Sequence, residues 1–271
     1  MPSTSESREP CGPTRGVVAD RPAIVLEDVW LGFRLRLYRQ RLTIRGTVVS
    51  AASGQLRRRR SRPTEVFWAL RGVSLVVNHG EILGVVGANG AGKSTLLRAI
   101  AGIYSPDRGR VWTDGRISTL LSFGAGFDLR RPGRENVYNN GVLLGLTREQ
   151  IRERMNAIME MADIGDFIDA PVMTYSSGMR ARLGFSVAVN VNSDIILIDE
   201  VVGAGDERFR QRVGTIFDRL SHRGKTIVFV THSMQAMTQY CTRAIWMEQG
   251  QVRLSGEPGE VGEAYIAAAK G

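Results

Sequence analysis

The chain has 271 residues, and its composition of 43% hydrophobic and 23% charged residues is typical of a globular protein with one large domain, or a core with a subdomain. No stretch approaches the roughly 18 uninterrupted apolar residues of a membrane-spanning helix, so the sequence predicts none. The formal net charge is +9, and the two cysteines, Cys11 and Cys241, exclude a disulfide framework and a cysteine-based metal site, which makes the reducing cytoplasm the expected compartment.

The first 20 residues form a polar leader, rich in proline, serine and glycine, without the apolar core of a signal peptide. Segments of this composition bury too little apolar surface to fold, so residues 1–20 are predicted to be disordered. The folded domain is expected to span residues 21–271.

The positive charge is concentrated between Arg34 and Arg62. This segment contains ten arginines, and no acidic residue occurs between Asp28 and Glu65, whereas the rest of the chain carries 26 basic and 27 acidic side chains. The basicity is therefore local to one arginine-rich insertion, residues 34–62, and is not a property of the whole fold. Two interpretations remain open: a solvated insertion, and a segment dedicated to binding anions.

Hydrophobic periodicity predicts alternating strands and helices along the chain. In the first half we expect strands at 24–30, 66–77 and 81–87, a helix at 94–103 and short strand-like pieces up to about residue 123. In the second half we expect a helix from 178 through 188, buried strands at 195–198 and 226–230, a helical stretch at 209–220, a hairpin at 244–254 and a helical tail from 257.

A further helix is predicted after Thr147, because residues 147–150 (Thr-Arg-Glu-Gln) have capping-box spacing. Its apolar face would contain Ile151, Met155, Ile158, Met159 and Ala162. The whole pattern predicts an α/β nucleotide-binding core that carries a β-subdomain and, at about residues 130–190, a helical subdomain.

A phosphate-binding loop follows the apolar run at 82–86. Glycines at three positions of the loop allow the sharp turn that aims backbone N–H groups at phosphate oxygens, and the next helix offers its positive end to the same anion. A lysine would reach the β- and γ-phosphates, and a serine hydroxyl would bind Mg²⁺. The loop consists of Gly87, Ala88, Asn89, Gly90, Ala91, Gly92, Lys93, Ser94 and Thr95.

Three further motifs narrow the class of nucleotide-binding protein. An apolar strand ends in Asp199 and Glu200, where the first carboxylate would hold Mg²⁺ and the second would polarise an attacking water. The run at 175–179 (Tyr-Ser-Ser-Gly-Met) opens a predicted helix, and hydroxyls at a helix N-terminus form an anion site. His232 directly follows a buried strand, at the sheet edge where ligands bind.

In this order and spacing, the motifs resemble those of the ATPase subunits of ABC transporters, over residues 24–255 or so. The resemblance implies a head-to-tail dimer in which each ATP lies between one chain's loop and the other chain's signature segment. It assigns Walker A to 87–95, Walker B and the catalytic glutamate to Asp199 and Glu200, and the end of the D-loop to Asp206. It also implies that Lys93 and His232, the switch histidine, are catalytic, and that Ser94 and Asp199 bind Mg²⁺. The signature residues would be Tyr175, Ser176, Ser177, Gly178 and Met179.

The sequence departs from the common family pattern in several places. The first, third and fifth signature positions hold Tyr, Ser and Met, where the family has Leu, Gly and Gln. The family's Q-loop glutamine would fall near 122–124, but no glutamine occurs between Arg116 and Pro132, so water or Ser122 could replace it. Two runs are similar to those of ATPases that export lipid-linked polysaccharides such as O-antigen, teichoic acid or cell-wall galactan. They are Gly-Ala-Gly-Phe at 124–127 and Gly-Arg-Glu-Asn at 133–136.

An aromatic side chain ahead of the loop is expected to stack on adenine. Phe67 and Trp68 occupy the family position, and Tyr38 is the alternative. For Phe67 and for Trp68 taken alone, simple core packing explains the residue equally well.

The resemblance implies an ATP-hydrolysing subunit, with ATP and Mg²⁺ as cofactors, on the cytoplasmic face of the membrane. Its partners would be a second copy of itself, a polytopic permease and a lipid-linked glycan substrate, with no nucleic acid expected. The helical block at about 132–170 would dock on the permease. Some members carry a C-terminal carbohydrate-binding domain, and we expect none here, because about fifteen residues follow Gly256.

Two other functions were weighed against export. The first is a soluble ABC ATPase that acts on nucleic acid or ribosomes through the arginine-rich insertion, but the chain has neither a second cassette nor a long coiled-coil insertion. The second is an import ATPase, which conflicts with the missing glutamine and the Gly-Ala-Gly-Phe run.

Overall fold

A computed structural model of the chain describes residues 21–34, 66–120, 126–199 and 207–270. Several sequence predictions therefore lie outside the described residues. They concern the leader (1–20), the insertion beyond Arg34 with Tyr38, the positions 122–124, Glu200 and Asp206.

A small antiparallel sheet contains β1 (Pro22–Arg34), β2 (Val66–Asn78) and β4 (Arg108–Thr113), in the order β2-β1-β4. The β1–β2 ladder shifts register between Leu31 and Gly32, because Leu31 pairs with Leu70 while Gly32 pairs with Trp68. Such a shift is a β-bulge, which changes the face that the following side chains occupy.

The larger sheet has six strands in the order β5-β6-β7-β3-β8-β9. The first five run parallel, and only β9 is antiparallel, since it pairs with β8 through a hairpin. Every residue of β3, β6 and β7 is buried, which explains why these strands are continuous apolar runs without alternation. The strands are β3 (Ile82–Val86), β5 (Ile117–Leu120), β6 (Ile195–Ile198), β7 (Thr226–Val230), β8 (Arg243–Glu248) and β9 (Gln251–Gly256).

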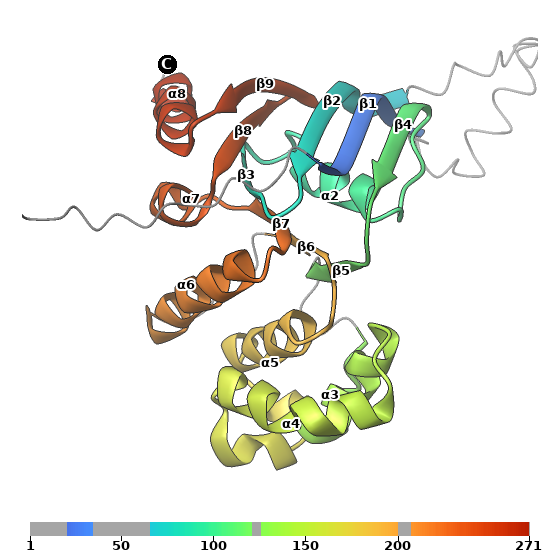
Figure 1. Cartoon of the computed structure of the whole chain (residues 1–271), viewed down its shortest axis with the longest axis vertical. Coiled ribbons are helices and arrows are strands. Elements are labelled where there is room, and N and C mark those ends of the chain that lie inside the picture. Colours follow the sequence, from blue (N-terminus) through green and yellow to red (C-terminus); the bar gives the residue numbers. More distant parts are fainter. Residues whose placement is uncertain (1–20, 35–65, 121–125, 200–206, 271) are drawn as a thin grey trace, which may run out of the picture.

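Two apolar cores cover the faces of the larger sheet. The first packs α2 (Lys93–Ile100) between the two sheets, with Leu96, Leu97 and Ile100 almost completely buried. The second core lies on the other face and is built largely from α6 (Glu207–His222), α7 (Met234–Tyr240), α8 (Pro258–Lys270) and the end of α5. Figure 1 shows α7 and α8 beside β8 and the small sheet on the opposite side of the molecule.

The remaining helices pack around a third core, at the bottom of Figure 1. We call this part the helical subdomain. It contains α3 (Gly133–Leu143), α4 (Arg148–Ala162), the 3-10 turns η1 (Gly165–Asp169) and η2 (Val172–Thr174), and α5 (Ser177–Val189).

The capping box before α4 is confirmed. The Thr147 hydroxyl accepts the N–H of Gln150 (3.2 Å), and the Gln150 side chain accepts the N–H of Thr147 (3.0 Å). Along the helix Ile151, Ile158 and Ala162 are fully buried, as the periodicity predicted.

The sequence also predicted the hairpin between β8 and β9, whose turn residues Gln249 and Gly250 both have positive φ (48° and 82°). The predicted end of the first helix was wrong by three residues. α2 ends at Ile100, because the N–H groups of Ile103 and Tyr104 both turn back to the carbonyl of Arg98 and Gly102 adopts a φ of 71°. Short α7 was not predicted at all.

The mixed α/β class is confirmed. In the part of the chain that the structure describes, no helix combines the length and the hydropathy needed to cross a lipid bilayer.

Candidate functional site

The glycine-rich loop follows β3 and requires glycine at two positions for steric reasons. A Cβ on Gly87 would lie 2.3 Å from the carbonyl oxygen of Met247, and one on Gly92 would lie 2.6 Å from that of Ala69. Gly92 also has a φ of 102° and directly precedes α2. The loop is thus wedged between β2 and the β8–β9 hairpin, and only glycine fits at these two positions.

Lys93, the first residue of α2, lies back over the loop. Its side chain is only 6% exposed, and Nζ donates hydrogen bonds to the carbonyl oxygens of Gly87 (2.7 Å) and Ala88 (3.1 Å). The ammonium thus lies beside the N-terminus of the helix, where the helix dipole also favours an anion. This arrangement suits phosphate binding.

The sheet brings the other predicted groups to the same edge as the loop. β3, β7 and β6 are adjacent and parallel, with Val85 opposite Val230 and Ile198 opposite Phe229. Asp199 and His232 follow the carboxyl ends of β6 and β7, and the loop follows that of β3. Parallel strands end at one edge, so the loop, the carboxylate and the imidazole share the edge at which α/β sheets bind ligands.

Two neighbouring residues fix the backbone on either side of His232. The N–H of buried Thr231 donates to the carbonyl of Val85 (3.2 Å), which ties the end of β7 to β3. The N–H of Ser233 donates to the Thr231 hydroxyl (3.0 Å), while the Ser233 hydroxyl caps α7 by accepting from Ala236 (3.2 Å). His232 therefore sits at a defined point between strand and helix, with an exposed side chain.

The residues available for a divalent cation are Ser94 and Asp199. Among the described residues there is no group of three or more His, Cys, Asp or Glu that would enclose a metal ion. Mg²⁺ usually takes one or two protein oxygens and completes its octahedron with water and phosphate oxygens. One hydroxyl and one carboxylate at the edge of the loop fit a cation that arrives together with a nucleotide.

The signature segment lies at the start of α5. The Ser176 hydroxyl accepts the N–H of Met179 (3.1 Å) as an N-cap, and Ser176 and Ser177 are both exposed. Helix α5 packs on β5, which lies three strands from β3 in the sheet order. The signature residues thus belong to the helical subdomain, whereas the loop, Asp199 and His232 belong to the sheet edge.

Tyr175 explains why an aromatic residue precedes these serines. It is 3% exposed, and its hydroxyl donates a short hydrogen bond to the carbonyl of Phe167, while burial raises its pKa. A Cβ on Gly133 would lie 2.2 Å from that hydroxyl, so a glycine at the start of α3 makes room for the ring. Tyr175 anchors the signature segment to α3 and η1 and offers no group to a nucleotide.

The two predicted adenine aromatics lie on opposite faces of β2. Trp68 pairs with Gly32 and packs edge-on against Trp30, with ring centroids 5.6 Å apart. Phe67 pairs directly with Phe33 and is 47% exposed. Directly paired residues share a face, so Phe67 and Phe33 lie together.

Phe33 was missed by the sequence reasoning. It packs against the first core, and its ring contacts Tyr104 with a centroid distance of 5.5 Å. Its pairing with Phe67 could have identified it, but that pairing is known only once the register of the β1–β2 ladder is known.

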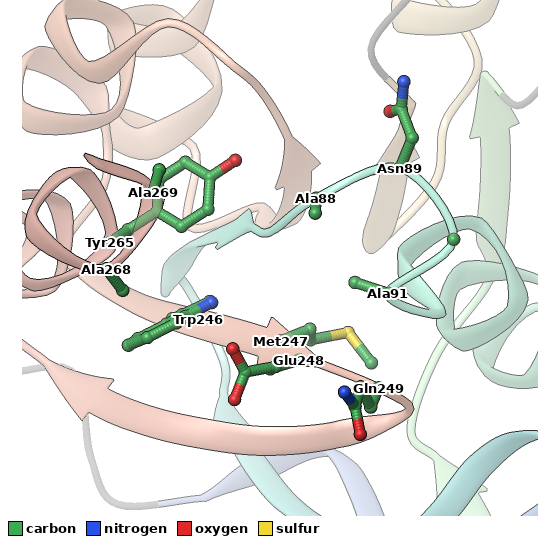
Figure 2. Close-up of a pocket in the computed structure, with 11 residues that line it drawn as sticks. Ala88, Asn89, Ala91, Trp246, Met247, Glu248, Gln249, Tyr265, Ala268 and Ala269 are labelled. Carbon is green, nitrogen blue, oxygen red and sulfur yellow. The ribbon is translucent and has the colours of Figure 1, made fainter. Parts of the chain in front are cut away.

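A cavity of about 320 Å³ is lined by Ala88, Asn89, Gly90 and Ala91 of the loop, but not by Lys93 or Ser94. Figure 2 shows Trp246 of β8 and Tyr265 of α8 facing Ala88 and Ala91 across this space. The two rings are 6.0 Å apart. The cavity thus lies between the loop and α8, and no sequence motif pointed to it.

Comparisons with known proteins agree with this geometry. A protein-family model described as "ABC transporter" matches residues 70–203. The chain is 44% identical over 247 residues to the O-antigen export system ATP-binding protein RfbB of Myxococcus xanthus, covering 90% of this chain and 55% of that protein. It is 44% identical over 200 residues to a Klebsiella pneumoniae RfbB, covering 73% of this chain and 81% of that protein.

A third relative is the teichoic acids export ATP-binding protein TagH of Bacillus cereus, which is 42% identical over 200 residues. The match covers 74% of this chain and 36% of TagH. The chain therefore spans only about a third to a half of the length of TagH and of the Myxococcus RfbB.

Solved structures show the same fold. The dimeric post-hydrolysis structure of the ATP-binding cassette MJ0796, bound to ADP and Pi, has a TM-score of 0.70 at 21% identity and covers 87% of this chain and 98% of that one. The structure of cbiO1 from Clostridium perfringens has a TM-score of 0.65 at 19% identity, covering 92% and 94%. These comparisons confirm the resemblance that the motifs indicated.

Proposed function

Because the chain belongs to the ABC transporter family of ATP-binding proteins, we propose that it is the ATP-hydrolysing subunit of an exporter that moves a lipid-linked polysaccharide or glycolipid across the cytoplasmic membrane. The observation that carries the proposal is the convergence of the loop, Asp199 and His232 at one sheet edge. It occurs in a chain whose relatives at 42–44% identity include ATP-binding proteins named for O-antigen and teichoic acid export.

In this function the loop binds the phosphates of ATP. Lys93 turns from the carbonyls of Gly87 and Ala88 toward the β- and γ-phosphates, which supply stronger, charged acceptors. Ser94 and Asp199 would hold Mg²⁺, which would neutralise phosphate charge when bound. Glu200 accepts a proton from the attacking water, and His232 steadies the γ-phosphate from the end of β7.

The active unit is a head-to-tail dimer of two copies. Ser176, Ser177 and Gly178 stand exposed or half-exposed at the N-terminus of a 13-residue helix, on the helical subdomain. A second copy would place these hydroxyls and N–H groups against the γ-phosphate held by the first copy's loop.

The permease docks on the helical block at 132–170. The support for this surface is a set of large apolar side chains that are at least half exposed: Val142 (50%), Leu143 (71%) and Phe167 (52%). The chain thereby sits on the cytoplasmic face of the membrane as a peripheral subunit.

Adenine stacks on the Phe67 side of β2. There the exposed Phe67 pairs with the partly buried Phe33, whereas Trp68 packs against Trp30 on the other face. Tyr38 lies outside the described residues and is a second candidate.

Purification of the tagged chain from its native membranes in mild detergent tests the function. We expect a protein with several membrane spans to co-purify and a lipid-linked glycan to stimulate ATP hydrolysis by the complex. Co-purification of RNA or ribosomes without a membrane protein would instead favour a soluble ATPase acting on nucleic acid.

A further inference from the structure

A cavity of about 170 Å³ lies at the amino ends of β6 and β7, the edge of the sheet opposite the nucleotide site. Its lining comes from α4, from the turn after α5 and from the segment that joins α6 to β7. It therefore lies where the helical subdomain meets the sheet. We call it the amino-edge cavity.

Three positive side chains line the amino-edge cavity: Arg154 from α4, and Arg223 and Lys225 from the α6–β7 segment. None of its lining residues is acidic. Among the described residues, Asp194 forms an ion pair with this cluster: its Oδ1 lies 3.6 Å from Lys225 Nζ, while its Oδ2 accepts the N–H of Arg116 (3.0 Å).

Part of this positive charge is already compensated. Arg154 Nη1 donates to the carbonyl of Asn190 (2.6 Å) and so caps the end of α5. The C-termini of α5 and α6 each contribute roughly half a negative charge. Together with one carboxylate they offset about two of the three cations, so that, counting only the residues that the structure describes, about one positive charge stays uncompensated.

Ser193 provides an independent sign of a missing ligand. The residue is 1% exposed, and among the described residues its Oγ has no hydrogen-bond partner. Its N–H, in contrast, donates to the carbonyl of Val191 (3.0 Å). A buried hydroxyl without a partner carries a desolvation cost. Helix capping explains why arginines lie nearby, but it does not explain why this hydroxyl has no partner.

We propose that the amino-edge cavity binds a phosphate-class oxyanion, either free or as the phosphate group of a larger molecule. Ser193 would donate its hydroxyl proton to one anion oxygen, while Arg223 and Lys225 meet the others with charge-assisted hydrogen bonds. The cavity, at about 170 Å³, is large enough for one tetrahedral oxyanion.

A larger ligand has room beside the cavity. A groove of about 960 Å³ between the helical subdomain and α6 adjoins it and shares Asn190, Leu220 and Arg223. Because Arg154 belongs to the helical subdomain and Arg223 to the sheet side, the bound anion would link the two parts. This proposal is independent of what the exporter transports.

Equilibrium dialysis with radiolabelled inorganic phosphate tests the site on the full chain. Saturating Mg²⁺ and a non-hydrolysable ATP analogue occupy the glycine-rich loop, so that phosphate cannot bind there. We expect about one phosphate per chain in addition to the analogue. Arg223→Gln should weaken binding at least about tenfold, since it removes a charge-assisted partner. Arg219→Gln is the matched control, because Arg219 lines the groove but not the cavity.

Ser193→Ala keeps the proposal testable if Arg223→Gln fails to fold. Without phosphate, this variant should be at least as stable as the parent, because it removes an unpartnered buried hydroxyl. With phosphate, its rise in melting temperature should be smaller than that of the parent. Absence of the extra phosphate, or unchanged binding by both Arg223→Gln and Ser193→Ala, would overturn the proposal.

Glucose 1-phosphate distinguishes the two sources of the anion. If glucose 1-phosphate binds at least tenfold tighter than inorganic phosphate, and Arg219→Gln weakens its binding, the groove holds the rest of a phosphate ester. Equal or weaker binding assigns the cavity to the free anion.

Discussion

The ammonium of Lys93 donates a hydrogen bond of 2.7 Å to the carbonyl of Gly87, six residues earlier and at the start of the loop that the lysine follows. The contact closes the loop around a buried positive charge. Two neutral carbonyl oxygens accept hydrogen bonds from this ammonium, and phosphate oxygens are stronger acceptors because they carry charge.

Lys93→Ala should therefore weaken ATP binding by about ten- to a hundredfold, the loss expected for charge-assisted hydrogen bonds to phosphate. Isothermal titration calorimetry with Mg-ATP measures the effect. Arg98→Ala in the last turn of α2 is the control, since Arg98 lies over the Tyr104 ring at 6.0 Å and away from the loop. Equal losses in both variants would contradict the assignment.

Glu200→Gln should retain ATP binding, because Lys93, Mg²⁺ and the loop N–H groups still meet the phosphates. It should lose about 10²–10⁴ in turnover, the usual contribution of a general base. Dimers should accumulate with ATP, which size-exclusion chromatography detects. Asp218→Asn, at an exposed carboxylate of α6, serves as the control. A near-normal rate for Glu200→Gln would assign the base elsewhere.

A mixture of two inactive variants tests the head-to-tail dimer. Ser176→Arg disables the signature segment, and Lys93→Ala disables the loop, so neither homodimer should hydrolyse ATP. In the mixed dimer one site contains both changes, while the other has an intact loop facing an intact signature segment. Partial recovery of ATPase activity on mixing is expected. If mixed dimers form and stay inactive, either the sites are not shared between copies or both must be intact.

How far the sequence predicts this site depends on the range of the contacts involved. The capping box at Thr147 was predicted correctly because it is set by residues only three positions apart, and the glycine-rich loop between β3 and α2 is likewise a local motif. The motif has glycine at positions 87 and 92, and the structure requires glycine there because the carbonyls of Met247 and Ala69 leave no room for a Cβ. These carbonyls lie far away in the chain or on another strand, so the local motif does not reveal this reason.

Long-range register was beyond the sequence. The bulge between Leu31 and Gly32 decides that Phe67 faces Phe33 while Trp68 faces Trp30, and nothing in the local pattern fixes that shift. The amino-edge cavity likewise combines Arg154, Ser193 and Arg223, which only the packing of α4 and α6 brings together. Local motifs and the ends of buried strands were therefore predictable, whereas contacts that depend on register or on the packing of helices were not.

Cys241 should resist alkylation in the folded protein. Burial raises the pKa of its thiol from 9.0 to about 12, so very little thiolate exists at pH 8. In a Cys11→Ser background, reaction with iodoacetamide should be slow in buffer and rapid in denaturant. Because the folded pKa is the higher one, the thiol contributes stability that is present below about pH 9 and is lost as the pH rises toward 12. Rapid labelling without denaturant would show that Cys241 is accessible.

The arginine-rich insertion is expected to contact an anionic surface. Each arginine near acidic lipid headgroups contributes about 1 kcal/mol, and this attraction decays within a Debye length. Replacing Arg57, Arg58, Arg59 and Arg60 by serine should therefore weaken binding to phosphatidylglycerol liposomes at low salt and lower substrate-stimulated ATPase, while basal ATPase is retained. The control replaces four exposed arginines elsewhere, Arg71, Arg110, Arg130 and Arg253, and so removes the same net charge. If the two variants bind liposomes equally and respond equally to substrate, net charge alone explains the attraction and the insertion is a solvated loop.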